Sequence, residues 1–347
     1  MTGYCFEKPE ETALTRQTLT RRSLAGTALA LPFVRRAYAE LGQVVIAKQF
    51  GTLYLQQDVM ERHQLVEKHA GRLGLPGLRT SYVKLGGTGP VTEALLSGSL
   101  HFASGGAPGA LLLWDRTRGA VKSAFAMNAS NQRLLTVGPA TSVAELKPED
   151  RIALPAAKVS PQAIYLQMAA AQAFGAAEWA KLDPQTISRA HPDSAAQMIG
   201  RTEINCHFST TPFQERELKA AGVREITNSY SIQGVTTSTP NTIYAQSSFR
   251  TENPLAWQAT LAAFDEATNW INQYPMDAAQ LYLDASGEKD TAYNVQAGMQ
   301  APGNRFTLQP ANVQFLANFM TDCGTLKRRP QNLADLFFPE AVERGGS

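Results

Sequence analysis

Residues 81–110 contain, twice in succession, a short apolar run, a loop of small residues and then a proline. The loops are residues 86–89 and 104–107, and the prolines that follow them are Pro90 and Pro108. Proline is favoured at the first position of a helix, because its missing N–H would have no partner there. Strand–loop–helix units in series predict an α/β fold whose helix N-termini gather at one edge of a mostly parallel sheet and form a ligand site there.

A longer pattern runs through the same stretch: Gly89-Pro90-x-x-Glu93-Ala94-Leu95-x-Ser97-Gly98-Ser99-Leu100-His101-Phe102-Ala103-x-Gly105-Gly106-x-Pro108. It resembles the signature of nitrate-, sulfonate- and taurine-type periplasmic binding proteins, the solute receptors of ABC importers. The resemblance extends over roughly residues 43–275. It implies a two-lobed type 2 periplasmic-binding-protein fold, in which each lobe is a mostly parallel sheet flanked by helices.

The first 39 residues have the features of an export leader. Thr20-Arg21-Arg22-Ser23-Leu24 resembles a twin-arginine motif, residues 24–34 are modestly apolar, and residues 37–39 form a small-x-small cleavage site before Glu40. The apolar run is about half the length that a membrane span needs. We therefore expect a cleaved twin-arginine signal peptide over residues 1–39 and a soluble periplasmic protein; an uncleaved, disordered tail is the alternative.

The excess of basic over acidic residues in the sequence comes from this leader. It holds six of the 32 Lys and Arg residues and three of the 30 Asp and Glu residues, so the mature chain has a net charge of about −1. Such a chain lacks the excess of positive charge that is typical of nucleic-acid-binding proteins.

The mature chain is long enough for two domains with their own cores. With the resemblance as a guide, we expect residues 40–130 to form the first part of lobe 1 and residues 131–236 to form lobe 2. Residues 237–347 then return to lobe 1 and supply the C-terminal helices. Polar, small residues over 128–132 and 234–241 are the expected hinges between the lobes.

The loops that join strands to helices supply the candidate ligand-binding residues. Proline opens four of the expected helices, at Pro90, Pro108, Pro161 and Pro212, and Thr52 could cap a fifth. Helix N-termini attract negative charge through their free N–H groups and their dipole. The candidates are Gln49, Phe50, Tyr54, Gly87, Thr88, Ser104, Gly105, Gly106, Lys158, Ser160, His207, Ser209 and Thr210.

This set of residues suits a small anion such as a sulfonate, nitrate or carboxylate, held by backbone and hydroxyl donors and not by a salt bridge. Each Ser or Thr could instead only cap its helix. Lys158 could pair with an anion or lie in solvent, and His207 could donate to a ligand or be buried beside the core strands. The resemblance also places ligand contacts in the first loop, which contains Gln49 and Phe50.

Motifs of common enzymes are missing from the sequence. It contains no H-E-x-x-H, G-x-S-x-G or Walker motif and no cysteine spacing typical of a metal site. Cys206 and His207 are adjacent on an expected strand, so their side chains point to opposite faces and make a poor nucleophile–base pair. Cys206 and Cys323 could form a disulfide in an oxidising compartment or stay free.

We therefore predict a non-catalytic receptor, without cofactor or metal, that passes a small solute to the permease and ATPase subunits of an ABC importer. Two alternatives remain. One is a protein of the same fold that binds a thiamine-pyrimidine precursor, or a synthase-like enzyme related to it. The other is a sensory binding module.

Overall fold

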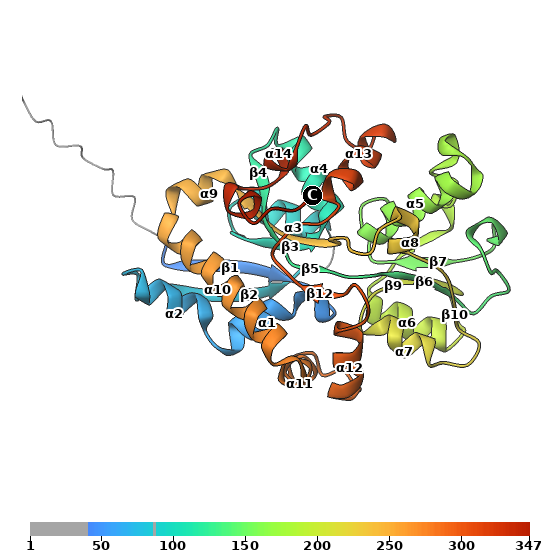
Figure 1. Ribbon diagram of the computed structural model, residues 1–347, viewed down its shortest axis with the longest axis horizontal. Coiled ribbons are helices and arrows are strands. Elements are labelled where there is room, and N and C mark those ends of the chain that lie inside the picture. The colour runs from blue at the N-terminus through green and yellow to red at the C-terminus, as the bar shows by residue number, and fades with distance from the viewer. Residues whose placement is uncertain (1–40, 86–87) are drawn as a thin grey trace, which may run out of the picture. The chain divides into compact units, whose positions relative to one another are not determined.

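The computed structural model describes residues 41–85 and 88–347 (Figure 1). The expected leader, with its twin-arginine motif and cleavage site, and the candidate Gly87 lie outside the described residues. Thr88 begins helix α3 (Thr88–Leu96), but its side chain is also outside the described part.

The first sheet has the strand order β2-β1-β3-β11-β4. Its strands are β1 (Gln43–Lys48), β2 (Arg79–Lys84), β3 (Ala103–Gly106), β4 (Val121–Ala126) and β11 (Asn241–Gln246). A parallel bridge from Ile46 to Phe102 joins the β1–β2 pair to the three-stranded sheet β3-β11-β4. β11 runs antiparallel to both of its neighbours, and the other strands share one direction.

The second sheet repeats this arrangement with the order β8-β7-β9-β6-β10. Its strands are β6 (Arg133–Thr136), β7 (Ile152–Leu154), β8 (Thr186–Ser188), β9 (Cys206–Ser209) and β10 (Arg224–Asn228). β6 is the single antiparallel strand and takes the place that β11 has in the first sheet. The expected mostly parallel sheets are confirmed. Each sheet contains one reversed strand, because that strand follows a crossing of the chain from the other half.

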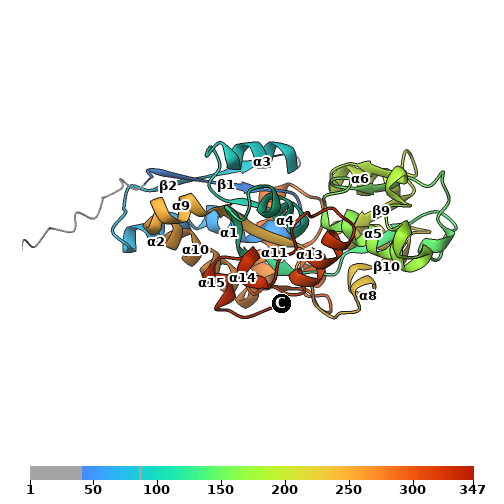
Figure 2. The ribbon, with the colours of Figure 1, turned by 90° about the horizontal axis from the view of Figure 1, so that it is seen from above.

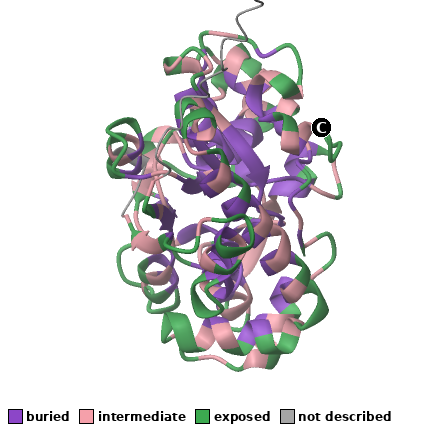
Figure 3. Ribbon diagram, turned by 90° about the vertical axis from the view of Figure 1, so that its left-hand side faces the viewer, coloured by how far each residue is buried: buried purple, intermediate pink, exposed green. Residues whose placement is uncertain are grey.

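Helices cover both sheets (Figures 1 and 2). The first sheet has α1 (Leu55–Arg62), α2 (Leu65–Arg72) and α10 (Pro254–Gln273) on one face and α3 on the other, as Figure 2 shows. The helices of the second sheet are α5 (Pro161–Phe174), α6 (His191–Ile199), α7 (Phe213–Leu218) and α8 (Ser229–Gln233). The buried residues in Figure 3 lie on the strands and on the inward sides of these helices.

The C-terminal segment packs on the first sheet and on the helices that cover it. It contains α11 (Pro275–Ser286), α12 (Ala292–Met299), α13 (Val313–Asp322), α14 (Leu333–Leu336) and α15 (Pro339–Val342). Trp257 of α10 stacks on Phe102 with 5.1 Å between ring centroids and meets Phe338 edge-on at 4.9 Å. The N–H of Phe338 donates to the carbonyl of Ser123 on β4 at 2.9 Å. These aromatic rings therefore join the last part of the chain to the first sheet.

Two segments connect the halves and run side by side. The backbone N–H of Ser130 donates to the carbonyl of Ser238 at 3.3 Å, and that of Met127 donates to the carbonyl of Asn241 at 3.0 Å. A short strand at the first crossing, β5 (Asn128–Ala129), pairs with β12 (Arg305–Phe306). The two expected hinge segments are thus adjacent in space.

Cys206 and Cys323 are free thiols; Cys206 is buried on β9, and Cys323 is half-buried at the end of α13. The alternative of a disulfide between them is therefore not realised. No helix within residues 41–85 and 88–347 is both long enough and apolar enough to cross a membrane.

Candidate functional site

Six strand-to-helix junctions, three from each half, line one cavity of about 290 Å³. The first half contributes the junctions after β1, β2 and β3, and α4 (Ala107–Arg116) begins at the last of them. The second half contributes the junctions after β7, β8 and β9. This volume is at the lower end of the range for small-molecule sites. The expectation that helix N-termini meet at one cleft is confirmed for these junctions.

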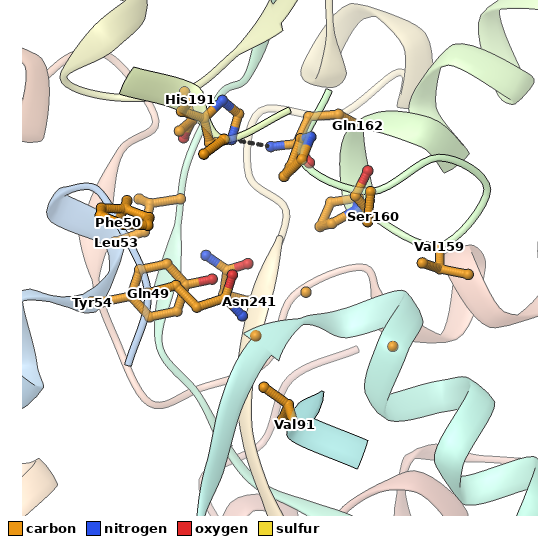
Figure 4. Close-up of a pocket in the computed structure, with 18 of the residues that line it drawn as sticks. Gln49, Phe50, Leu53, Tyr54, Val91, Val159, Ser160, Gln162, His191 and Asn241 are labelled. Atoms are coloured by element: carbon orange, nitrogen blue, oxygen red, sulfur yellow. Dashed lines mark hydrogen bonds between the residues drawn. The ribbon is translucent and has the colours of Figure 1, made fainter. Parts of the chain in front are cut away.

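Seven of the predicted ligand residues line this cavity. They are Gln49, Phe50, Tyr54, Gly105, Gly106, Ser160 and Thr210. Figure 4 shows Gln49 and Tyr54 on one side of the cavity and Ser160 on another. Phe50 is 48% exposed and has Lys84 Nζ 5.5 Å from its ring centroid. The hydroxyl of Ser160 accepts a hydrogen bond from the N–H of Ala163 at 3.2 Å, so Ser160 also caps α5.

Four other predicted residues are described by the structure but are not in the cavity lining. The hydroxyl of Ser104 donates to the carbonyl of Ala47 inside the first sheet. Ser209 and His207 are fully buried on β9, and Lys158 is exposed with a φ of 68°. For His207 and Lys158 the structure shows the second alternative, burial beside the core strands and exposure to solvent. Ser104 and Ser209 are buried because side chains on a strand alternate between faces, so a residue near the end of a strand can point into the core.

The two halves touch each other beside the cavity. A Cβ atom added to Gly106 would lie 2.5 Å from Cδ of Pro161, at the start of α5. The hydroxyl of Thr52 donates to the carbonyl of Thr211 at 3.2 Å, and Arg216 Nη1 lies 2.8 Å from Glu288 Oε2. Position 106 therefore has to be glycine in this arrangement, because a side chain there would clash with Pro161 of the opposite half.

The cavity wall is largely apolar, and most of the hydrogen-bonding side chains in it are uncharged. Nε2 of Gln49 donates to the carbonyl of Ser104 at 3.1 Å. Oε1 of Gln132 and Oγ1 of Thr210 are buried and have no hydrogen-bond partner among the described residues. Burial raises the pKa of Tyr54 and of Tyr244, so both phenols stay protonated and can donate.

Arg189 is the one residue with a formal charge among the described lining residues. Its Nη1 lies 2.8 Å from Oε2 of Glu203, which offsets that charge. The interior of the cavity therefore offers an incoming ligand neutral donors and acceptors.

His191 lies on the cavity wall and is the most notable residue that the sequence reasoning missed. Its Nε2 is 3.2 Å from Nε2 of Gln162, as Figure 4 shows. Its Nδ1 is 2.9 Å from Nε2 of His207. His207 in turn places Nδ1 2.6 Å from Oε1 of Glu217. Burial, with a smaller contribution from His207, lowers the pKa of His191 well below its usual value, so its imidazole is neutral.

The sequence contains a pattern that could have identified His191 as a residue of the site. Residues 186–188, Thr-Ile-Ser, are followed by Arg189, Ala190, His191 and then Pro192, which is the same strand–loop–proline pattern as in residues 81–110. In the structure, α6 begins at His191. The three-residue strand before it was too short to recognise.

Solved structures of periplasmic binding proteins have this fold. The alkanesulfonate-binding protein SsuA from Xanthomonas axonopodis pv. citri, bound to MOPS, superposes with a TM-score of 0.68 at 16% identity, over 86% of this chain and 99% of that chain. The nitrate-binding protein NrtA from Synechocystis PCC 6803 gives 0.64 at 13% identity, over 88% of this chain and 86% of that chain. The aliphatic sulphonate-binding protein SsuA from Escherichia coli superposes with a TM-score of 0.62 at 18% identity, over 86% of this chain and 92% of that chain.

No protein-family model and no curated protein matches the sequence. The structural likeness establishes the two-lobed periplasmic-binding-protein fold. It also agrees with the resemblance seen in residues 89–108.

Proposed function

We propose that this chain is an extracytoplasmic receptor that binds a small anion, such as a sulfonate or nitrate, and delivers it to the permease and ATPase of an ABC importer. The observation that carries this proposal is the meeting of six strand-to-helix junctions, from two sheets, on one small cavity. Solved proteins of the same fold include alkanesulfonate- and nitrate-binding receptors.

The helices at the cavity favour an anion. Helices α5 and α6 begin at the lining residues Pro161 and His191, and α4 begins directly after the lining residue Gly106; each has proline in its first turn. The free N–H groups of a first helical turn and the helix dipole attract negative charge. Three such helices around one cavity would therefore stabilise a buried anion without a charged side chain.

Neutral side-chain donors complement these helices. The phenols of Tyr54 and Tyr244 line the cavity and are available to an anion's oxygen atoms. Since Arg189 is already paired with Glu203, we propose that the ligand is held by hydrogen bonds and not by a salt bridge.

The lobes would close on the ligand about the two crossings. Residues 128–132 and 234–241 lie side by side, and each connects one sheet with the other. We propose that these segments are the hinges, with lobe 2 over residues 131–236 and lobe 1 over residues 40–130 and 237–347. The leader over residues 1–39 would direct the receptor to the periplasm by the twin-arginine route.

A pyrimidine-like heterocycle is the second candidate ligand. Four carboxamides line the cavity, namely Gln49, Gln132, Gln162 and Asn241. Amide side chains offer paired donors and acceptors that match the edge of a heterocycle. This observation keeps the thiamine-precursor branch of the fold as the alternative.

Native mass spectrometry of the purified mature protein is the direct test, because a retained ligand adds its mass to that of the protein. A thermal-shift panel of sulfonates, nitrate, carboxylates, pyrimidines and neutral amides then sorts the ligand classes. A ligand at a hundred times its Kd stabilises the folded state by about 2.7 kcal/mol. Stabilisation by anions supports the proposal, whereas stabilisation by heterocycles or cations alone refutes it.

A further inference from the structure

Two phenols in the cavity wall are nearly buried and have no hydrogen-bond partner within the described part of the chain. Tyr54 is 7% exposed and Tyr244 is 2% exposed, and both residues line the cavity. No described residue donates to or accepts from either hydroxyl. A buried hydroxyl without a partner is unfavourable, so two of them at one cavity indicate a ligand that supplies the missing partner.

The phenols belong to a group of polar side chains around Gly105 on β3. A Cβ atom added to Gly105 would lie 3.4 Å from the hydroxyl of Tyr244 and 3.2 Å from Nε2 of Gln49. Nε2 of Gln49 donates to the carbonyl of Ser104, and because a carbonyl only accepts, this bond fixes the orientation of the amide. A second hydrogen on the same nitrogen is left for a ligand. Burial, with a smaller contribution from Tyr244, raises the pKa of Tyr54, as expected for two neighbouring phenols.

Asn241 on β11 adds a fourth polar side chain to this group. It lines the cavity and is 4% exposed, and its carboxamide has no partner among residues 41–85 and 88–347. Figure 4 shows Asn241 together with Gln49 and Tyr54. We call Gln49, Tyr54, Asn241 and Tyr244 the donor group. It offers several hydrogen-bond donors and no formal charge, and all of it comes from the first sheet and the segment that follows β1.

The cavity wall beyond the donor group includes apolar side chains from both lobes. Leu85 and Val91 belong to the first lobe, and Ala156 and Val159 belong to the second. Figure 4 shows Val91 and Val159 apart from the labelled members of the donor group. An inorganic anion at the donor group would leave this apolar surface in contact with water, whereas a hydrocarbon chain would cover it.

We propose that the donor group holds the acidic head of an organic anion, and that the hydrocarbon body of this ligand lies against Leu85, Val91 and Val159. The cavity then selects organic acids with a short apolar chain over inorganic anions such as nitrate. This proposal rests on the proposed function for the negative charge of the ligand. It adds the chemical class of the ligand and the direction in which it lies.

Thermal unfolding of the ligand-free variants Tyr54→Phe and Tyr244→Phe tests whether the two hydroxyls are free. Each change removes a single oxygen atom, and removal of an unpartnered hydroxyl from a buried site does not destabilise a protein. We expect unfolding midpoints at or above that of the wild type. Clearly lower midpoints in both variants would show that the phenols have partners within the protein and would overturn the proposal. This measurement needs no ligand, so its result is independent of the proposed function.

Calorimetry with nitrate and with the sodium salts of methane-, ethane-, propane- and butanesulfonate tests the ligand class. We expect Kd to fall by roughly fourfold with each added methylene, which is the effect of burying one such group. Nitrate should bind more weakly than butanesulfonate. Equal or tighter binding of nitrate would overturn this proposal and leave the anion receptor in place. Failure of every anion to bind would refute the proposed function, and this proposal with it.

Variants at the two parts of the cavity separate the head of the ligand from its body. Tyr54→Phe and Tyr244→Phe should each raise Kd by about 10- to 150-fold across the whole series, because a hydrogen bond to a charged group is lost. Val159→Thr should instead reduce the gain per methylene and leave the Kd of methanesulfonate close to the wild-type value. A gain per methylene in Val159→Thr equal to that of the wild type would contradict the position of the body.

Tyr82→Phe is the matched control. The hydroxyl of Tyr82 on β2 is also buried without a partner among the described residues, but Tyr82 is outside the cavity lining. This variant should bind each sulfonate as the wild type does. Wild-type affinity in both Tyr54→Phe and Tyr244→Phe would overturn the assignment of the donor group.

Discussion

Replacement of Gly106 by alanine should weaken ligand binding because it holds the two lobes apart. The added Cβ would lie 2.5 Å from Cδ and 2.9 Å from Cγ of Pro161. Carbon atoms pack at about 3.5–4.0 Å, so the lobes must separate by roughly 1 Å at this point. A hydrogen bond of about 2.9 Å that spans the lobes through the ligand would then be lost.

The expected loss of affinity follows from the loss of this one hydrogen bond between the lobes and the ligand. A hydrogen bond to a charged group contributes about 1.5–3 kcal/mol, so Gly106→Ala should raise Kd by about 10- to 150-fold. Gly106→Val should abolish binding. The structure shows that the absence of a side chain at position 106 makes room for Pro161.

Calorimetry with the best anion of the panel measures this change, and X-ray scattering measures the associated loss of compaction. Gly71→Ala in α2 is the matched control, because a Cβ there meets no atom within 4 Å. The unfolding free energy of Gly106→Ala without ligand should stay near the wild-type value, since opening of the lobes relieves the clash. Wild-type affinity together with wild-type compaction in Gly106→Ala would refute the reasoning.

The remaining predictions concern export, hinge motion, thiol reactivity and one lysine. Changing both Arg21 and Arg22 to lysine should prevent the protein from reaching the periplasm; normal periplasmic accumulation of this variant would contradict the twin-arginine assignment. X-ray scattering of the wild type should show a smaller radius of gyration at saturating ligand, and identical profiles would indicate a rigid module. Burial raises the pKa of Cys206 and of Cys323 to about 11 each, so both thiols should react slowly with iodoacetamide at pH 7. The half-buried Cys323 should be labelled first, and faster labelling of Cys206 would contradict its buried position. Lys158→Ala should change anion affinity by less than about threefold, because exposed charges contribute little, and a loss of tenfold or more would place this side chain at the ligand.

The fold was predictable because the residues that set it are close together in the sequence. Pro161 begins α5 as expected, since proline is favoured at the start of a helix. The pairing of β11 between β3 and β4 was not predictable from such local signals. It depends on contacts between segments more than a hundred residues apart, such as the hydrogen bond from Ser123 to Thr242.

The site was predictable only in part, for a related reason. Gln49, Phe50 and Tyr54 were found because they follow directly after a recognisable strand. Ser104 and Ser209 were misplaced, because the face of the sheet to which a strand's last residues point depends on register. The contact of His207 with Glu217 joins a strand to a helix, and nothing in the sequence marks two such residues as partners.

The position of β11 also constrains the order in which the protein can be made. The second sheet is built from a single continuous stretch, whereas the first sheet stays divided until β11 is inserted between β3 and β4. During synthesis, the earliest strands must therefore wait for more than a hundred further residues before their sheet is complete. Such distant pairing slows folding and leaves strand edges open in the meantime. A route that exports only completed folds would hold the chain in the cytoplasm through this interval.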